Sequence, residues 1–195
     1  INNSVPFLII IEVTLWLSIA FHSVYGFYIA RTGRSNLSRY AYQGNRRYVL
    51  QRLSGYVGFV FILYHVATLR WGWSFLIPGG TKWSAEFAAS TMAQALNGGG
   101  SSAAGLVVSA GYLLGVTMLV FHFANGLWTA AISWGLTVSA AAQRRWGYAC
   151  VALGAGLMVM AWSAVISFAT LDVKRAEATE RNMLKDHSPP ATARP

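Results

Sequence analysis

Long apolar runs separated by short polar connections dominate the pattern of this chain. Crossing the hydrocarbon core of a membrane takes about 20 residues as a helix. Four runs are long enough: residues 5–30, 48–71, 103–137 and 146–171. No run alternates apolar and polar residues over about ten positions, as a membrane strand does. The pattern therefore predicts an all-α integral membrane protein, a bundle of transmembrane helices with four spans.

The polar segments divide the chain further. We expect a membrane bundle over residues 1–171 and a polar tail over residues 172–195, of which the last ten or so residues are predicted to be disordered. The third run is too long for one perpendicular crossing, so it should tilt strongly or extend beyond the membrane. Glycine-rich breakers isolate residues 84–96, the candidate for a short surface helix with Ser84 as its N-cap.

The placement of the arginines indicates how the spans are oriented. The net charge is +9, but 55% of the residues are hydrophobic and only 11% are charged, which favours a membrane protein over a nucleic-acid-binding one. Basic residues cluster before the second and fourth spans, whereas residues 76–102 carry only Lys82. Cytoplasmic loops are enriched in such residues, so we place these two connections inside and Ile1, residues 76–102 and the tail outside. The clustered residues are Arg31, Arg34, Arg39, Arg46, Arg47, Arg52, Arg144 and Arg145.

Three of the four histidines, His22, His65 and His122, lie in three different spans. Ionisable residues inside a membrane are costly and usually face the bundle interior. A single one is compatible with a neutral imidazole hydrogen-bonded across helices, but three favour metal ligation. At 1.5 Å per residue, His22 lies about 12 Å and His65 about 25 Å from the cytoplasmic side, so they cannot share a metal; His122 lies between them. Cys150 is the only cysteine, which excludes a cysteine-clustered metal site.

Glycines share the helical face of two of these histidines. Gly58 lies about two turns before His65, and Gly115 and Gly111 lie two and three turns before His122. Two interpretations are open. The glycines either allow close helix packing of the small-xxx-small kind, or they leave room for a flat macrocycle beside an axial imidazole.

Four motifs resemble those of one family. They are Phe21-His22-Ser23-Val24-Tyr25-Gly26, Tyr48-Val49-Leu50-Gln51-Arg52-Leu53-Ser54-Gly55, Tyr64-His65-Val66 and Phe121-His122-Phe123-Ala124-Asn125-Gly126-Leu127-Trp128. From about residue 5 to residue 143 the chain resembles the cytochrome b membrane-anchor subunit of succinate dehydrogenase or fumarate reductase, in its dihaem, five-helix, single-subunit form. The pattern His-x-x-Asn-Gly-x-Trp is the most specific element of this resemblance.

The resemblance implies four axial histidines for two haem b groups. By matching motif, His22 and His122 would bind the haem nearer the cytoplasm, and His65 would bind the outer haem. The second outer ligand would belong to a first helix that precedes Ile1 and that this sequence lacks. The resemblance thus implies one complete bis-histidine site in this chain.

Haem propionates need polar partners near the membrane surface. We expect Arg52, Gln51 and Ser54, at the cytoplasmic start of the second span, and Trp128, six residues after His122, to hold those of the inner haem. Arg52 is equally well explained as an arginine of the cytoplasmic surface.

Glu12 is the only acidic residue within a span. It lies about 15 Å from His22 toward the outside, where its carboxyl group could exchange protons with a quinone; a structural, hydrogen-bonded carboxyl is the alternative. The resemblance further implies menaquinone, a flavoprotein and an iron–sulfur subunit on the cytoplasmic face, and a bacterial inner membrane. The arginine-rich connection is a candidate landing surface for these subunits, although lipid phosphates and topology explain it equally well.

Two other functions are open. A non-redox helical membrane protein, such as a proton-coupled transporter, would use interior histidines for proton transfer and would bind no haem. A dihaem cytochrome b anchor of another respiratory oxidoreductase would have other soluble partners.

Overall fold

The computed structural model describes residues 7–35, 37–100 and 102–186, and these residues form helices and connections without a strand. Four helices are long and apolar enough to cross a membrane, which confirms the predicted fold class. In chain order the elements are α1 (Leu8–Thr32), α2 (Gln43–Leu69), the short 3₁₀ helix η2 (Ser74–Leu76), α3 (Ala88–Leu96), the 3₁₀ turn η3 (Gly98–Gly100), α4 (Ser102–Ser133), α5 (Ala140–Thr170) and α6 (Val173–Asp186).

The helix ends differ from the apolar runs by a few residues. α2 and α5 begin five and six residues before the expected starts, because arginine-containing segments continue the helix beyond the apolar part. α4 ends at Ser133, before a left-handed Gly135 at φ 72°. Ser139 then caps α5, accepting a hydrogen bond from the amide of Ala142 over 3.2 Å. At 32 residues and about 48 Å, α4 exceeds a hydrocarbon core of about 30 Å.

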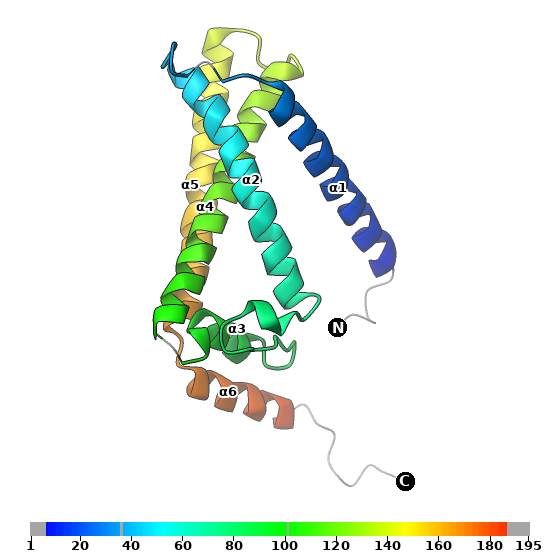
Figure 1. Cartoon of the computed structure of the whole chain (residues 1–195), viewed down its shortest axis with the longest axis vertical. Helices are drawn as coiled ribbons and strands as arrows, with labels where there is room; N and C mark the ends of the chain where they lie inside the picture. Colours follow the sequence, from blue (N-terminus) through cyan, green and yellow to red (C-terminus); the bar gives the residue numbers. More distant parts are fainter. Residues whose placement is uncertain (1–6, 36, 101, 187–195) are drawn as a thin grey trace.

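α4 is the central helix of the bundle, since it packs against both α2 and α5. α1 is different: it has no buried residue, and Figure 1 shows that it diverges from α2 toward its N-terminal end. Aromatic contacts join α1 to α2 near the other end, where Phe27 packs against Tyr56 and Phe59. No side chain of α1 is therefore buried within the bundle.

The best-packed part of the protein lies at the end of the bundle where α3 is found. Leu96, Val108, Tyr112 and Val165 form the buried core there and join α3, α4 and α5. The expected short helix in residues 84–96 exists, but it begins at Ala88 and packs against α4 and α5. The N-cap position belongs to Phe87, so the assignment of Ser84 was wrong. The Ser84 hydroxyl instead accepts the Phe87 amide at 3.4 Å within a turn.

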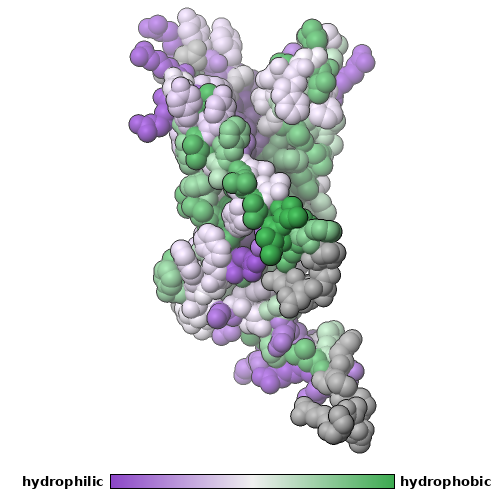
Figure 2. Space-filling view, turned by 90° about the vertical axis from the view of Figure 1, so that its right-hand side faces the viewer, coloured by the Kyte–Doolittle hydropathy of each residue, from purple (hydrophilic) through white to green (hydrophobic). Residues whose placement is uncertain are grey.

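Polar side chains gather at the two ends of the molecule, and a mostly apolar band lies between them (Figure 2). The eight clustered arginines lie at the end where α1 connects to α2 and α4 connects to α5, which is the upper end in Figure 1. This end carries no acidic residue in its connections or neighbouring helix turns. The separation of charge along the bundle agrees with a protein that crosses the membrane several times.

Much of the polar tail is helical. α6 lies across the end of the bundle below α3 (Figure 1), and Glu180 accepts the Ala89 amide at 2.7 Å. Arg181 lies over the Phe87 ring at 5.6 Å. The predicted disorder at the end of the tail, and the fourth histidine His187, lie outside the described residues.

Candidate functional site

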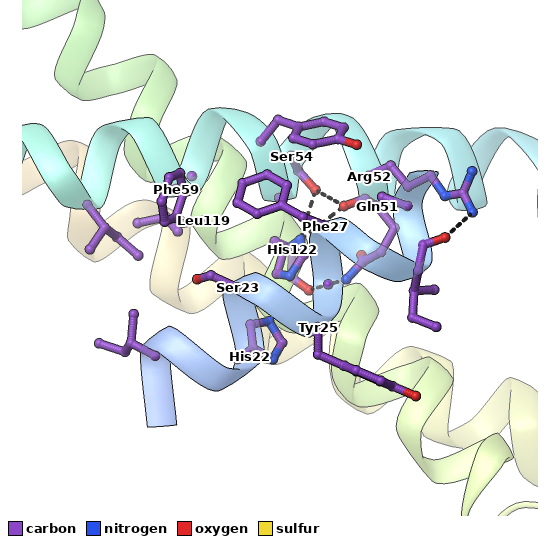
Figure 3. Close-up of a pocket in the computed structure, with 18 of the residues that line it drawn as sticks. His22, Ser23, Tyr25, Phe27, Gln51, Arg52, Ser54, Phe59, Leu119 and His122 are labelled. Carbon is purple, nitrogen blue, oxygen red and sulfur yellow. Dashed lines mark hydrogen bonds between the residues drawn. The ribbon is translucent and has the colours of Figure 1, made fainter. Parts of the chain in front are cut away.

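A cavity of about 690 Å³ lies between α1 and α2, and α4 closes it with Leu119 and His122. Cavities of this size are typical of small-molecule and cofactor sites. Its wall is largely apolar and aromatic, with a polar group at the arginine-rich end (Figure 3). Of the residues expected to form the inner haem site, His22, Gln51, Arg52, Ser54 and His122 line this cavity.

The structure brings the imidazoles of His22 and His122 together. Their ring centroids are 6.0 Å apart and their planes are at 89°. Two imidazoles that bind one metal from opposite sides, with metal–nitrogen bonds of about 2 Å, have centroids about 6 Å apart. The membrane depth of His122, counted in residues, did not decide which histidine is its partner. In the structure, the packing of the helices places His122 beside His22.

Hydrogen bonds fix the ring of His122 from the side of α2. Its Nδ1 lies 3.1 Å from the backbone oxygen of Gln51 and 3.3 Å from the hydroxyl of Ser54, which is fully buried. The carbonyl oxygen can only accept, so Nδ1 carries the proton and Nε2 keeps its lone pair. Metal-binding histidines usually have this arrangement, in which the nitrogen that does not bind the metal donates to a carbonyl.

The side chain of Gln51 also contacts α4. Its Nε2 donates to the backbone oxygen of His122 over 3.1 Å, and its Oε1 accepts from Nδ2 of Asn125 over 2.8 Å. Asn125 is 5% exposed. We did not single out Asn125 from the sequence as a site residue; the signal was an amide one turn after a histidine within an apolar span.

Arg52 joins the end of α1 to α2. Its guanidinium group donates to the backbone oxygens of Gly33 at 3.1 Å and Ile29 at 3.4 Å, and it contacts the Tyr48 hydroxyl. These carbonyls belong to the C-terminal end of α1, where a positive charge is favourable. Arg52 therefore anchors the helix that carries His22, in addition to lining the cavity.

Trp128 is not brought to the cavity. Its indole N–H donates to the backbone oxygen of Gln143 over 3.1 Å, and the guanidinium group of Arg47 lies 4.3 Å above its ring. The first contact ties α4 to the start of α5, and the second ties α4 to α2. A role of Trp128 at a propionate stays a prediction, and the structure gives this residue a packing role.

His65 lies apart from the other two histidines. It is eleven residues after Ser54, about 16 Å along α2, and it does not line the cavity. Its ring packs against Tyr112 and Phe61, with centroids 5.9 Å and 5.8 Å away. Nδ1 of His65 is buried and has no hydrogen-bond partner among the described residues. Ligation of an outer haem by His65 stays a prediction.

The glycines near the histidines lie at the contact of α2 with α4. A Cβ at Gly115 would overlap the Phe61 ring, and a Cβ at Gly58 would lie 2.7 Å from Leu119. Gly111 has open space around it. Close helix packing therefore accounts for Gly58 and Gly115. Gly55, which the sequence did not single out in this way, allows the closest approach to His122, since its Cβ would lie 3.1 Å from Cε1 of the imidazole.

Glu12 forms an ion pair with Arg70 at the other end of α2. The carboxylate accepts a hydrogen bond from the guanidinium group over 2.7 Å, and both side chains are partly exposed. One turn further along α1, Trp16 stacks on Trp71 with centroids 6.0 Å apart. These contacts hold α1 to α2 far from the histidine pair, and the sequence gave no sign of Arg70 as the partner.

The donor set suits a haem better than a metal held by protein ligands alone. The described residues contain no group of three or more His, Cys, Asp and Glu side chains able to hold a metal ion. A haem iron with two axial imidazoles requires only two such side chains, because the porphyrin supplies the remaining ligands. His22 and His122 meet this requirement at the edge of a large apolar cavity.

Comparison with known proteins gives one clear relative. No family model and no solved structure matches the chain. The succinate dehydrogenase cytochrome b558 subunit of Bacillus subtilis (strain 168) is 34% identical to it over 167 residues, which cover 85% of this chain and 75% of that protein. The similarity thus extends over most of both chains. The chain belongs to the family of succinate dehydrogenase cytochrome b subunits.

Proposed function

We propose that this chain is the haem b-containing membrane anchor of a succinate:quinone oxidoreductase and relays electrons between an iron–sulfur subunit and membrane quinone. The observation that carries the proposal is the pair His22 and His122, whose imidazole rings lie 6.0 Å apart in the wall of a largely apolar cavity. Membership of the succinate dehydrogenase cytochrome b family supports the same function.

The residues of the cavity have distinct tasks in this proposal. His22 and His122 hold the iron, and the Gln51 carbonyl and Ser54 hydroxyl keep the His122 ring in its orientation. A haem b held by these two imidazoles would supply one-electron transfer. The apolar wall excludes water, and Arg52 provides a positive charge for a propionate at the arginine-rich end.

Quinone chemistry is proposed for the opposite end of the bundle. His65 is the candidate ligand of an outer haem there, and Glu12 is the candidate for proton exchange with the quinone, which we take to be menaquinone. Two observations support this assignment. Glu12 is the only acidic residue of α1, and Arg70 holds its carboxylate at the end of α2 that follows His65.

The arginine-rich end is proposed to face the cytoplasm and to receive the flavoprotein and iron–sulfur subunits. It combines eight arginines with no acidic residue in the same connections and helix ends. Such an end is retained on the cytoplasmic side of a bacterial inner membrane, and it can also bind lipid phosphates. The cavity with His22 and His122 reaches Tyr48 and Arg52 at this end, on the path that electrons from a cytoplasmic subunit would take.

The test is a reduced-minus-oxidised spectrum with haem quantification on the complex purified with its soluble subunits. It is repeated for His22→Ala, His122→Ala and His65→Ala. We expect the first two variants to lose the same haem signal and the third to retain it. Addition of succinate should reduce this haem in the wild type.

Three results would overturn parts of the proposal. Loss of different haems in His22→Ala and His122→Ala would contradict the pairing. A wild-type protein without a Soret band would contradict haem binding and favour a non-redox membrane protein. Haem that succinate cannot reduce would indicate the anchor of another oxidoreductase.

A further inference from the structure

A chain of side-chain hydrogen bonds crosses the contact between α2 and α4 beside the histidine pair. It runs from Asn125 to Gln51 and from Gln51 to His122. We infer that Asn125 is a positioning residue for the imidazole of His122 and that it acts through the side chain of Gln51. This inference rests on the proposed haem site and assigns a role to a residue that does not itself contact the ring.

The chain has only one consistent direction. The backbone oxygen of His122 can only accept, so the amide nitrogen of Gln51 faces it, at 3.1 Å. The amide oxygen of Gln51 then faces Asn125, which must present its own NH₂ group, at 2.8 Å. The carbonyl of His122 therefore sets the direction of the Gln51 amide, and the Asn125 NH₂ group completes the chain by donating to the amide oxygen of Gln51.

Gln51 holds His122 at two places at once. Its side chain binds the backbone oxygen of His122, and its backbone oxygen accepts Nδ1–H of the same residue over 3.1 Å. The imidazole and its own backbone are thus fixed to one residue of α2. If the Gln51 side chain were released, α4 could shift relative to α2 and the Nδ1 hydrogen bond would weaken.

The burial of Asn125 indicates that its donor matters. Its Oδ1 is buried and has no hydrogen-bond partner among the described residues. An unsatisfied buried polar atom lowers stability, and an apolar residue in this otherwise apolar helix would avoid that cost. The hydrogen bond to Gln51 is the interaction that only the amide provides.

Orientation of an axial imidazole affects the iron that it binds. A firm Nδ1–H donation to a carbonyl makes Nε2 a stronger ligand, and it fixes the plane of the ring. Loss of a residue that supports a metal ligand in this way typically lowers the affinity about 10–100-fold. Asn125 is therefore expected to influence haem retention, the reduction potential and the ferric spectrum.

The experiment compares Asn125→Ala with Thr129→Val in the complete complex. Thr129 lies one turn further along α4, and its hydroxyl bonds only to backbone oxygens of its own helix. We expect Asn125→Ala to lose inner haem at least about tenfold more readily on dilution. In the haem that remains, we expect a shifted midpoint potential and shifted low-spin ferric EPR g-values. Thr129→Val should match the wild type in all three.

A double-variant cycle tests whether Asn125 acts through Gln51. Gln51→Met removes both side-chain hydrogen bonds and keeps the backbone carbonyl that binds Nδ1. The shift in the double variant should be no larger than that of Gln51→Met alone, because both changes break one chain. Additive shifts would contradict the inference. If Asn125→Ala does not accumulate in the membrane, Asn125→Leu, an apolar side chain of similar size without the NH₂ donor, carries the same test.

The two proposals fail in different ways. If Asn125→Ala keeps the haem retention, potential and EPR spectrum of the wild type while His122→Ala loses the haem, the positioning role is wrong and the haem site stands. If the wild-type complex holds no haem, the proposed function itself is wrong.

Discussion

The imidazoles of His122 and His65, which lie near the two ends of α2, are oriented by different kinds of contact. At the arginine-rich end, the rings of His122 and His22 lie 6.0 Å apart in the wall of a cavity of about 690 Å³, and Nδ1 of His122 donates to the backbone oxygen of Gln51. At the other end, His65 lies among the rings of Phe61 and Tyr112, and its Nδ1 has no partner in the described residues. The first imidazole is oriented by hydrogen bonds, and the second by aromatic packing.

The comparison shows that a histidine within a membrane span does not by itself define a site. What distinguishes the first region is an acceptor for Nδ1, a second imidazole opposite, and a loosely attached helix, α1, that leaves space between them. The second region is the better packed one, because α3 closes the bundle over Tyr112 and Val108. Each of the following changes should affect one region more than the other.

Glu12→Gln should have the largest effect. If the Glu12 carboxyl exchanges protons with the quinone, its replacement abolishes succinate:quinone turnover and leaves the haem spectra unchanged. Glu86→Gln removes another acidic residue outside the helices and should keep the turnover of the wild type. The measurement is quinone reduction by the purified complex, together with its reduced-minus-oxidised spectrum.

Arg70→Gln separates the proton-exchange role of Glu12 from a structural one. The carboxyl group remains in this variant, but the 2.7 Å ion pair is lost. Turnover should persist if Glu12 acts as the proton carrier. An equal loss in both variants would show that the ion pair matters only because it attaches α1 to α2.

Gly115→Ala should destabilise the packed region. The added Cβ would overlap the Phe61 ring, which also contacts His65. Overpacking of this kind costs about 1–3 kcal/mol. Gly111→Ala is the matched control, because nothing lies within 4 Å of a Cβ there and alanine is the better helix former. Thermal unfolding in detergent should show a lower Tm for the first variant alone; equal Tm values would contradict the close packing of α2 against α4.

The sequence was sufficient to predict the four long helices, because a helix needs about 20 apolar residues to cross a membrane. It was less exact at their ends, since Gln43 and Ala140 begin helices within polar segments that hydropathy does not assign. It also misplaced the start of α3, because the Ala89 amide is satisfied by Glu180 of α6 and not by the nearby Ser84. A contact between residues so distant in the sequence leaves no local pattern.

The candidate site was predictable in its residues but not in their contacts. Motif resemblance selected His22, His122, Gln51 and Ser54, all of which line the cavity. It did not show that Gln51 and Ser54 contact the His122 ring, because that depends on how α2 and α4 are rotated against each other. The same rotation turns Trp128 toward Gln143 and away from the cavity.

Arg52→Ala should weaken the open region selectively. The guanidinium group holds the last carbonyls of α1, and a positive charge at such a helix end contributes up to about 2 kcal/mol. We expect lower thermal stability and preferential loss of the haem that we propose His22 to bind. Arg46→Ala removes the same charge from an exposed position at that end. If both variants retain haem equally, anchoring of α1 by Arg52 is unimportant.

A second change reaches the same contact from α1. A Cβ at Gly33 would overlap the guanidinium group of Arg52, so Gly33→Ala should displace it without removing any charge. Its effect on haem retention should resemble that of Arg52→Ala. If Gly33→Ala retains haem as the wild type does, haem retention depends on the charge of Arg52 and not on its contact with α1.

Glu180→Ala should have the smallest effect, confined to the packed end. The Glu180 carboxylate accepts the amides of Ala89 and Ser90 in the first turn of α3, where a capping acceptor typically contributes about 1 kcal/mol. Its loss should speed hydrogen exchange of these two amides. Glu177→Ala removes only the ion pair with Arg181 on the surface of α6 and should leave that exchange unchanged. The haem proposed for His22 and His122 should be unaffected by either change, because α6 docks at the opposite end of the bundle. If Glu180→Ala altered that haem as well, the two ends of the bundle would be coupled through α4. They would then differ in their local contacts but would belong to one cooperative unit.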